Sequence, residues 1–183
     1  MKDIKIKDSL LRVSSQRGFD AFVQVFVDAI NESIDGNLTP DSMHQLSADQ
    51  ITLLGWNFLR NEVLEGGYIQ LIHNGYGEFI FHNPFGAAMR AWGLVELGKQ
   101  IVKAGKYYER YREEIEQDMS YDDFMALYEQ MPEFDDLDDY FVEKEEQWTE
   151  QIAQYIDEQS FTAAVAHYID EHIENFSKIK KDE

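Results

Sequence analysis

The sequence predicts an all-α, mainly helical fold, built as a single compact multi-helix domain, and three observations carry this prediction. Apolar side chains recur every three or four residues along most of the chain, which is the period of one face of a helix. Cap residues and prolines precede several of these segments, as they do at helix starts. Glycines follow several segments, where only glycine adopts the left-handed conformation without steric cost. The fold should contain at most one very short extended segment; residues 78–82 could form it, but five residues are too few to decide.

The chain of 183 residues has the length of one domain, 1–183, that buries its own core. Residues 1–14 are expected to form a short helix or an N-terminal arm, and residues 178–183 a frayed tail. The first clear helix follows Ser15. Its buried face is predicted to hold Phe19, Phe22, Val23, Phe26, Val27 and Ile30.

Two start signals follow. Thr39-Pro40 predicts a single helical turn, with threonine as the cap and proline at the first helical position. Ser47 and Gln50 have the spacing of a capping box and predict the start of the next helix.

The stretch 57–77 (NFLRNEVLEGGYIQLIHNGYG) is expected to form the centre of the core, because it has the lowest charge density of any long part of the chain. A helix should end at Gly66-Gly67, and a short helix or turn should restart at Tyr68. Four polar residues lie among the apolar ones. They either satisfy backbone groups at the glycine corner or line a ligand pocket. They are Asn61, Glu62, Gln70 and Asn74.

In the second half, Asn83-Pro84 predicts a helix start, and that helix should reach Ala104 before Gly105 breaks it. A continuation to about residue 117, a short helix opened by Ser120, and a helix from about Asp135 are expected next. The helix from Asp135 should bury Leu137, Phe141, Trp148, Ile152 and Ile156. A last helix is predicted over 161–176.

The net charge of −20, from 36 acidic and 16 basic side chains, excludes nucleic-acid and anionic-membrane binding and favours basic partners. Residues 109–158 hold 19 acids and 3 bases, so most of the charge lies in these fifty residues. The chain has no cysteine and no membrane-length apolar run, and the pattern of its first residues does not predict a signal peptide. A cytoplasmic protein is expected.

No residue pattern predicts catalysis, a metal or another cofactor. The histidines show no metal-binding spacing, the glycine pairs lack a phosphate-loop signature, and the acids after Asp136 miss the glycine and the glutamate of a calcium loop. The histidines are His44, His73, His82, His167 and His172.

Five acids of the helix from Asp135 recur at spacings of 4, 4, 3 and 4 residues and form a regular row. They are Asp135, Asp139, Glu143, Glu146 and Glu150. This spacing places them on one helix face, at a charge density comparable to part of a phosphate backbone. Like charges at this spacing destabilise a helix slightly, so the row is either a binding surface or a solvated face that maintains solubility. The expected partner contacts are Asp135, Asp136, Asp138, Asp139, Glu143, Glu146 and Glu150.

The central stretch resembles the DNA-mimic protein family of small acidic bacterial proteins. The matching residues are Glu62-Val63, Gly66, Gly67, Tyr68, Gln70, Asn74 and Gly77, with Asn83-Pro84-Phe85 and Arg90-Ala91-Trp92-Gly93 downstream. The resemblance implies an α-helical, dimeric protein that binds a transcription factor in place of DNA. The motif itself looks structural, so the mimic function would lie in the surface acids.

Three hypotheses follow. The first is a non-enzymatic DNA mimic that occupies the basic surface of a partner such as a transcription factor. The second is an immunity-type inhibitor of a basic toxin. The third is an enzyme or small-ligand binder with a pocket near Glu62, Gln70, His73 and Asn74.

Overall fold

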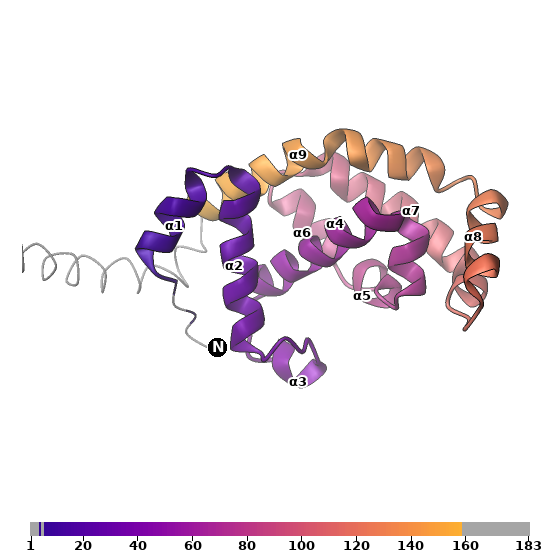
Figure 1. Cartoon of the computed structure of the whole chain (residues 1–183), viewed down its shortest axis with the longest axis horizontal. Coiled ribbons are helices and arrows are strands. Elements are labelled where there is room, and N and C mark those ends of the chain that lie inside the picture. Colours follow the sequence, from indigo (N-terminus) through magenta and orange to yellow (C-terminus); the bar gives the residue numbers. More distant parts are fainter. Residues whose placement is uncertain (1–3, 5, 159–183) are drawn as a thin grey trace, which may run out of the picture. The chain divides into compact units, whose positions relative to one another are not determined.

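The computed structural model describes residue 4 and residues 6–158, and this part of the chain is helical and contains no strand (Figure 1). The all-α prediction is confirmed, and the helix predicted over 161–176 and the tail 178–183 lie outside the described residues. The helices are α1 (Asp8–Ser15), α2 (Phe19–Ser33), α3 (Pro40–Met43), α4 (Ala48–His73), α5 (Gly77–Phe81), α6 (Phe85–Ala91), α7 (Val95–Ile115), α8 (Tyr121–Gln130) and α9 (Asp135–Glu158).

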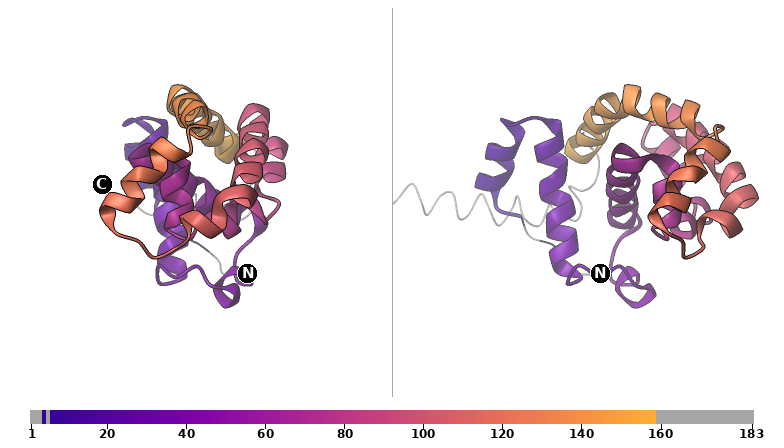
Figure 2. Two further views of the ribbon diagram at one scale, coloured as in Figure 1. Left: turned by 90° about the vertical axis from the view of Figure 1, so that its right-hand side faces the viewer. Right: turned by 45° about the vertical axis from the view of Figure 1, so that its right-hand side comes forward.

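Contacts along the chain group it into two compact units. Unit 1 comprises Met1–Leu54 and Thr149–Glu183, and unit 2 comprises Gly55–Trp148. Helices α4 and α9 therefore begin in one unit and end in the other. In both views of Figure 2 the first half of α9 runs along an edge of the helices of unit 2. A single domain over 1–183 stays a prediction.

In unit 1, α1 packs against α2, and the predicted apolar face of α2 is largely confirmed. Val23, Phe26, Val27 and Ile30 are all buried, whereas Phe19 is 49% exposed because it is the first residue of the helix. Both predicted caps form. The Ser42 N–H donates to Thr39 Oγ1 over 3.2 Å, and the Gln50 N–H donates to Ser47 Oγ over 3.1 Å, with the Ser47 N–H returning a bond to Gln50 Oε1.

The predicted glycine corner lies inside α4. Gly66 and Gly67 have non-helical backbone angles, and Gly67 has φ 72°, in the region that favours glycine. The residues after the corner form the most buried part of unit 2, as expected for the central stretch. Tyr68, Ile69, Leu71 and Ile72 have at most 1% of their surface exposed.

Two details of the second half of the sequence prediction were wrong, and one that the sequence left open is decided by the structure. Residues 77–81 form helix α5 and not a short extended piece, and its buried residues Gly77 and Ile80 are three apart, on one helical face. The helix predicted from Asn83 to Ala104 is divided by a turn at Gly93, which has φ 91°. Gly105 does not break α7, since a glycine weakens a helix by only about 1 kcal/mol and the Phe81 ring packs beside it.

Candidate protein-binding surface on the acidic helix

Helix α9 has one apolar and one acidic face. The predicted apolar stripe is confirmed, because Leu137, Phe141 and Trp148 of unit 2 are buried, and Ile152 and Ile156 are buried further along the helix. Within unit 2, Phe141 contacts the Trp56 ring of α4, with centroids 5.9 Å apart. The acids of the opposite face are exposed. They are Asp135, Asp136, Asp139, Glu143 and Glu146.

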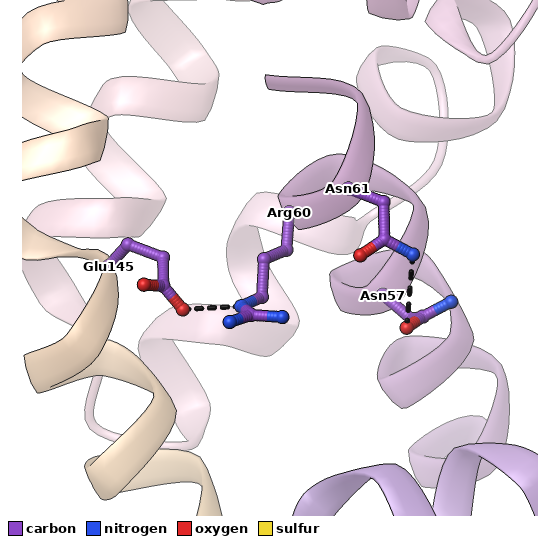
Figure 3. A network of polar contacts seen from close by, with 4 residues as sticks. All are labelled: Asn57, Arg60, Asn61 and Glu145. Atoms are coloured by element: carbon purple, nitrogen blue, oxygen red, sulfur yellow. Dashed lines mark hydrogen bonds and ion pairs between the residues drawn. The ribbon is translucent and has the colours of Figure 1, made fainter. Parts of the chain in front are cut away.

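An ion pair fixes the middle of α9 to α4. The Arg60 guanidinium of α4 donates through Nε to Glu145 Oε1 of α9 (Figure 3). Glu145 is only 7% exposed, so this acid is used inside the molecule and does not belong to the outer face. On the far side of Arg60 in Figure 3, Asn61 donates to Asn57 along α4 over 3.4 Å. The acidic face is therefore carried by a helix that is held by its buried apolar side chains and by an ion pair between the half-buried Arg60 and the buried Glu145.

Four exposed acids of α9 in unit 2 form what we call the acidic row. They are Asp135, Asp139, Glu143 and Glu146. At about 100° per residue these four positions span about 80° of the helix circumference. At a rise of about 1.5 Å per residue they stand roughly 4.5 to 6 Å apart along the axis. One cation of the same helix reaches the row, since Lys144 Nζ lies 2.7 Å from Glu143 Oε1. Apart from this pair, the row is a line of exposed negative charge along the helix.

Helix geometry explains only part of the row. Asp135, Asp136 and Asp138 lie in the first turn of α9, where negative charge is favoured by the helix dipole. Glu143 and Glu146 lie beyond the reach of that effect, which falls off within the first turn. Mutual repulsion along the row opposes helix formation there. Their presence on one exposed face is therefore not explained by helix stability.

Asp138, one of the predicted contacts, is placed differently from the row. Its carboxylate Oδ1 accepts the backbone N–H of Tyr68 over 2.8 Å, directly after the glycine corner. On the other side of the corner, the Tyr128 hydroxyl of α8 donates to the Gly66 carbonyl over 2.6 Å. A Cβ atom on Gly67 would stand 2.3 Å from Asp138 Oδ2. Asp138 is thus half-buried and joins α9 to the corner.

The surroundings of Asp138 shift its titration. Burial raises the pKa of the carboxyl from 3.8 to about 7, the Tyr68 N–H opposes this rise, and the negative charges of Asp135 and Asp139 add to it. The same carboxylate contributes to neighbouring shifts. The pKa of the Tyr128 hydroxyl is raised to about 12, by burial first and by Asp138 second. The pKa of the fully buried Tyr68 hydroxyl is raised for the same two reasons.

We expect Asp138 to make the protein less stable as the pH rises from about 4 to about 7. The folded state holds a proton on Asp138 over this range and the unfolded chain does not, so the unfolding free energy falls with pH and levels off above pH 7. The expected loss is about 2–4 kcal/mol. Asp138→Asn keeps an oxygen for the Tyr68 N–H and should remove this dependence. Urea unfolding of both proteins across pH 4–8 measures it, and an unchanged slope in Asp138→Asn would contradict the assignment.

The polar side chains of the central stretch form hydrogen bonds with one another. Gln70 Nε2 and Asn74 Nδ2 both donate to Glu62 Oε2, over 3.0 and 2.8 Å. The expectation that these side chains satisfy the backbone of the corner was wrong, because Asp138 and Tyr128 do so. His73 Nδ1 lies 2.8 Å from the Ile115 carbonyl, and its ring packs on Phe124. The residues predicted to line a ligand pocket are therefore engaged with one another or with the backbone.

The acidic surface extends beyond α9 within unit 2. Most acids between residues 109 and 134 are exposed, and the bases among them are engaged, with Arg110 beside Glu133 and Arg112 over the Tyr108 ring. Glu133 also accepts the Tyr111 hydroxyl over 2.6 Å. The exposed acids are Glu109, Glu113, Glu114, Glu116, Asp118, Asp122, Asp123 and Glu129.

Glu150, the last predicted contact, is half-buried, belongs to unit 1, and accepts a bond from Gln154 over 3.3 Å.

The inward roles of Asp138 and Glu145 had a signal in the sequence. Asp138 lies between Leu137 and Phe141, and Glu145 lies four residues after Phe141 and three before Trp148, so both point toward the apolar side of α9. Their partners had no such signal, because Tyr68, Tyr128 and Arg60 are far away in sequence.

No cluster of three or more histidine, aspartate or glutamate side chains has the geometry to hold a metal ion in the described part of the chain. No described helix combines the length and the apolar character needed to cross a bilayer.

Comparison with known proteins identifies the family. The model of the DMP19-like protein family matches residues 44–159, which include α4 to α9. The DNA mimic protein DMP19 of Neisseria meningitidis serogroup B is 38% identical over 117 residues, which cover 63% of this chain and 71% of the relative. The matched range includes the glycine corner, the Arg60–Glu145 ion pair and the acidic row. The chain therefore belongs to the DMP19-like family of DNA-mimic proteins.

Proposed function

We propose that this protein is a non-enzymatic DNA mimic that occupies the basic nucleic-acid-binding surface of a partner protein. The observation that carries the proposal is the acidic row on α9, which is exposed and held by a buried apolar face and an ion pair. The Neisseria relative, which bears the name of a DNA mimic, supports the same function. The partner is a DNA-binding protein of the transcription-factor class, bound in the cytoplasm by a homodimer of this chain.

The charge spacing supports competition with DNA. Duplex DNA carries one charge per ~3.4 Å of axis on each strand, and the row carries one per roughly 4.5 to 6 Å, supplemented by Asp136 beside it. A basic groove or helix that pairs with phosphates can pair with such a row without large rearrangement. The attraction is electrostatic, so it accelerates association and weakens as salt screens it.

The contacts are the four residues of the row together with Asp136. Asp138 is left out because its carboxylate binds the Tyr68 N–H and is half-buried. Glu150 is left out because it is half-buried and lies in the other unit. The exposed acids of residues 109–129 extend the negative field that steers the partner to the row.

Capture from the source cell's lysate tests this function. The protein is immobilised at low salt, eluted with a salt gradient, and compared with a row variant, in which Asp135, Asp139, Glu143 and Glu146 are all replaced by lysine. We expect wild type alone to retain a DNA-binding protein that duplex DNA displaces. Retention of nothing, or of the same proteins by the row variant, would contradict the proposal. Retention of a basic toxin that DNA does not displace would favour an immunity-type inhibitor instead.

A further inference from the structure

A pocket lies within unit 2 between α7 and the first turns of α9, beside the acidic row. Its volume is about 300 Å³, at the lower end of the range for ligand sites. Helix α9 contributes Asp136, Leu137 and Tyr140, so the pocket begins at one of the proposed contacts. Helix α7 contributes one face, consisting of Glu96, Lys99, Gln100 and Lys103.

Gln100 supplies an acceptor that has no donor. Its amide Nε2 donates to the Leu137 carbonyl over 2.6 Å, which fixes the side chain between the two helices. Its Oε1 is buried and has no hydrogen-bond partner among the described residues, and only 5% of the residue is exposed. An unsatisfied buried acceptor costs about 1–3 kcal/mol. A group that brings an N–H donor to this oxygen would recover that loss.

The charges of the lining leave little net attraction for a simple ion. Two carboxylates, Glu96 and Asp136, face two ammonium groups, Lys99 and Lys103. Lys99 Nζ already pairs with Glu96 Oε1 over 2.8 Å. Lys103 Nζ lies 6.0 Å from the centre of the Tyr107 ring. The Asp136 carboxylate is exposed at the pocket rim. The occupant is therefore selected by directional donors and by apolar contact more than by its charge.

An arginine side chain has the features that the pocket requires. Its guanidinium is planar and carries five N–H donors, which are enough for both the Gln100 oxygen and the Asp136 carboxylate. Its methylene stem matches the apolar Leu137, and guanidinium groups stack on tyrosine rings such as Tyr140. The Tyr140 ring already lies 5.9 Å from the Lys144 ammonium, so it serves as a cation acceptor. A lysine side chain has a compact, strongly hydrated head and cannot make these contacts at once.

We propose that the pocket between α7 and α9 takes one arginine side chain of the basic partner, as a specific anchor beside the electrostatic row. The inference rests on the proposed function, because the partner supplies the arginine. Nonspecific attraction by the row does not distinguish lysine from arginine strongly, whereas the pocket does. Partners with an arginine at the matching place are thereby selected from other basic proteins.

Two lysine-rich peptides of equal length and charge test the anchor, one of which has a single central arginine in place of a lysine. Fluorescence anisotropy at low salt should show the arginine peptide binding wild type about 3- to 10-fold more tightly. The double variant Asp136→Asn/Tyr140→Leu should remove that preference. The matched control Tyr121→Leu/Asp122→Asn changes an exposed tyrosine and an exposed acid of α8 outside the pocket. It should keep the preference for the arginine peptide.

The outcomes separate the two proposals. Equal binding of the two peptides to wild type, or a preference that survives in Asp136→Asn/Tyr140→Leu, would overturn the arginine anchor and leave the row intact. Failure of both peptides to bind wild type at low salt would contradict the proposed function itself. If circular dichroism shows that the double variant does not fold, the exposed-site variant Asp136→Asn decides, and it should lose part of the preference.

Discussion

Replacing Gly67 with alanine is expected to destabilise the protein by about 2–6 kcal/mol. The backbone at Gly67, with φ 72° and ψ −174°, lies in a region that is essentially restricted to glycine, and it costs an alanine about 1–3 kcal/mol. The new Cβ would also stand 2.3 Å from Asp138 Oδ2, so the carboxyl must move and the bond to the Tyr68 N–H is lost. That loss leaves a buried backbone donor unpaired, which costs about 1–3 kcal/mol more. Urea unfolding followed by circular dichroism measures the sum.

Gly75→Ala is the matched control for this variant. Gly75 also has a positive φ, 84°, but no atom lies within 4 Å of the added Cβ. It should therefore show the backbone cost alone, about 1–2 kcal/mol. In the double variant Gly67→Ala/Asp138→Ala the overlap between the Cβ and the carboxyl is removed. The double variant should therefore lose less free energy of unfolding than the sum of the losses of the two single variants. A Gly67→Ala variant as stable as Gly75→Ala would show that Asp138 does not pack against the corner.

The row variant is expected to bind the partner at least about 10³-fold more weakly than wild type at low salt. Four attractive pairs become four repulsive ones, and if each change is worth about 1–2 kcal/mol at a partly exposed interface, the total is about 4–8 kcal/mol. The wild-type affinity should fall steeply as salt is added, and the variant affinity should depend on salt much less. Titration calorimetry across a salt series measures both.

A control for net charge is available elsewhere in the chain. Four exposed acids outside residues 109–158 can be replaced by lysine to give the same change in charge. These are Glu32, Asp41, Glu65 and Glu78. If the row is the contact, this control should lose at most about tenfold in affinity, through the weaker long-range field. A control as weak as the row variant would show that only net charge matters.

Local signals in the sequence were enough to predict much of the fold. The capping pairs Thr39–Ser42 and Ser47–Gln50 lie within one helical turn, so their chemistry is visible in adjacent residues. The apolar stripe of α9 was equally visible. Residues 77–81 were harder, because five residues fit either an extended piece or a helix, and packing decided between them.

The candidate surface was only partly accessible to sequence reasoning. The exposed acids of the row follow from helical spacing, and the place of Asp138 between Leu137 and Phe141 indicates that it points inward. Its role depends on Tyr68, seventy residues earlier, which no local pattern reveals. The pocket beside the row was also missed, because it needs Gln100 and Leu137 from two helices to come together.

The most direct test of the mimic function is a competition at equilibrium with the captured partner and its own DNA site. A fixed concentration of partner and fluorescent DNA is titrated with wild-type protein at low salt. Because the row and the DNA phosphates would occupy the same basic surface, we expect the DNA to be released completely. When the titration is repeated at higher DNA concentrations, the apparent affinity of the protein for the partner should weaken in proportion. A ternary complex that retains the DNA, or release that the row variant produces equally well, would contradict DNA mimicry by this helix.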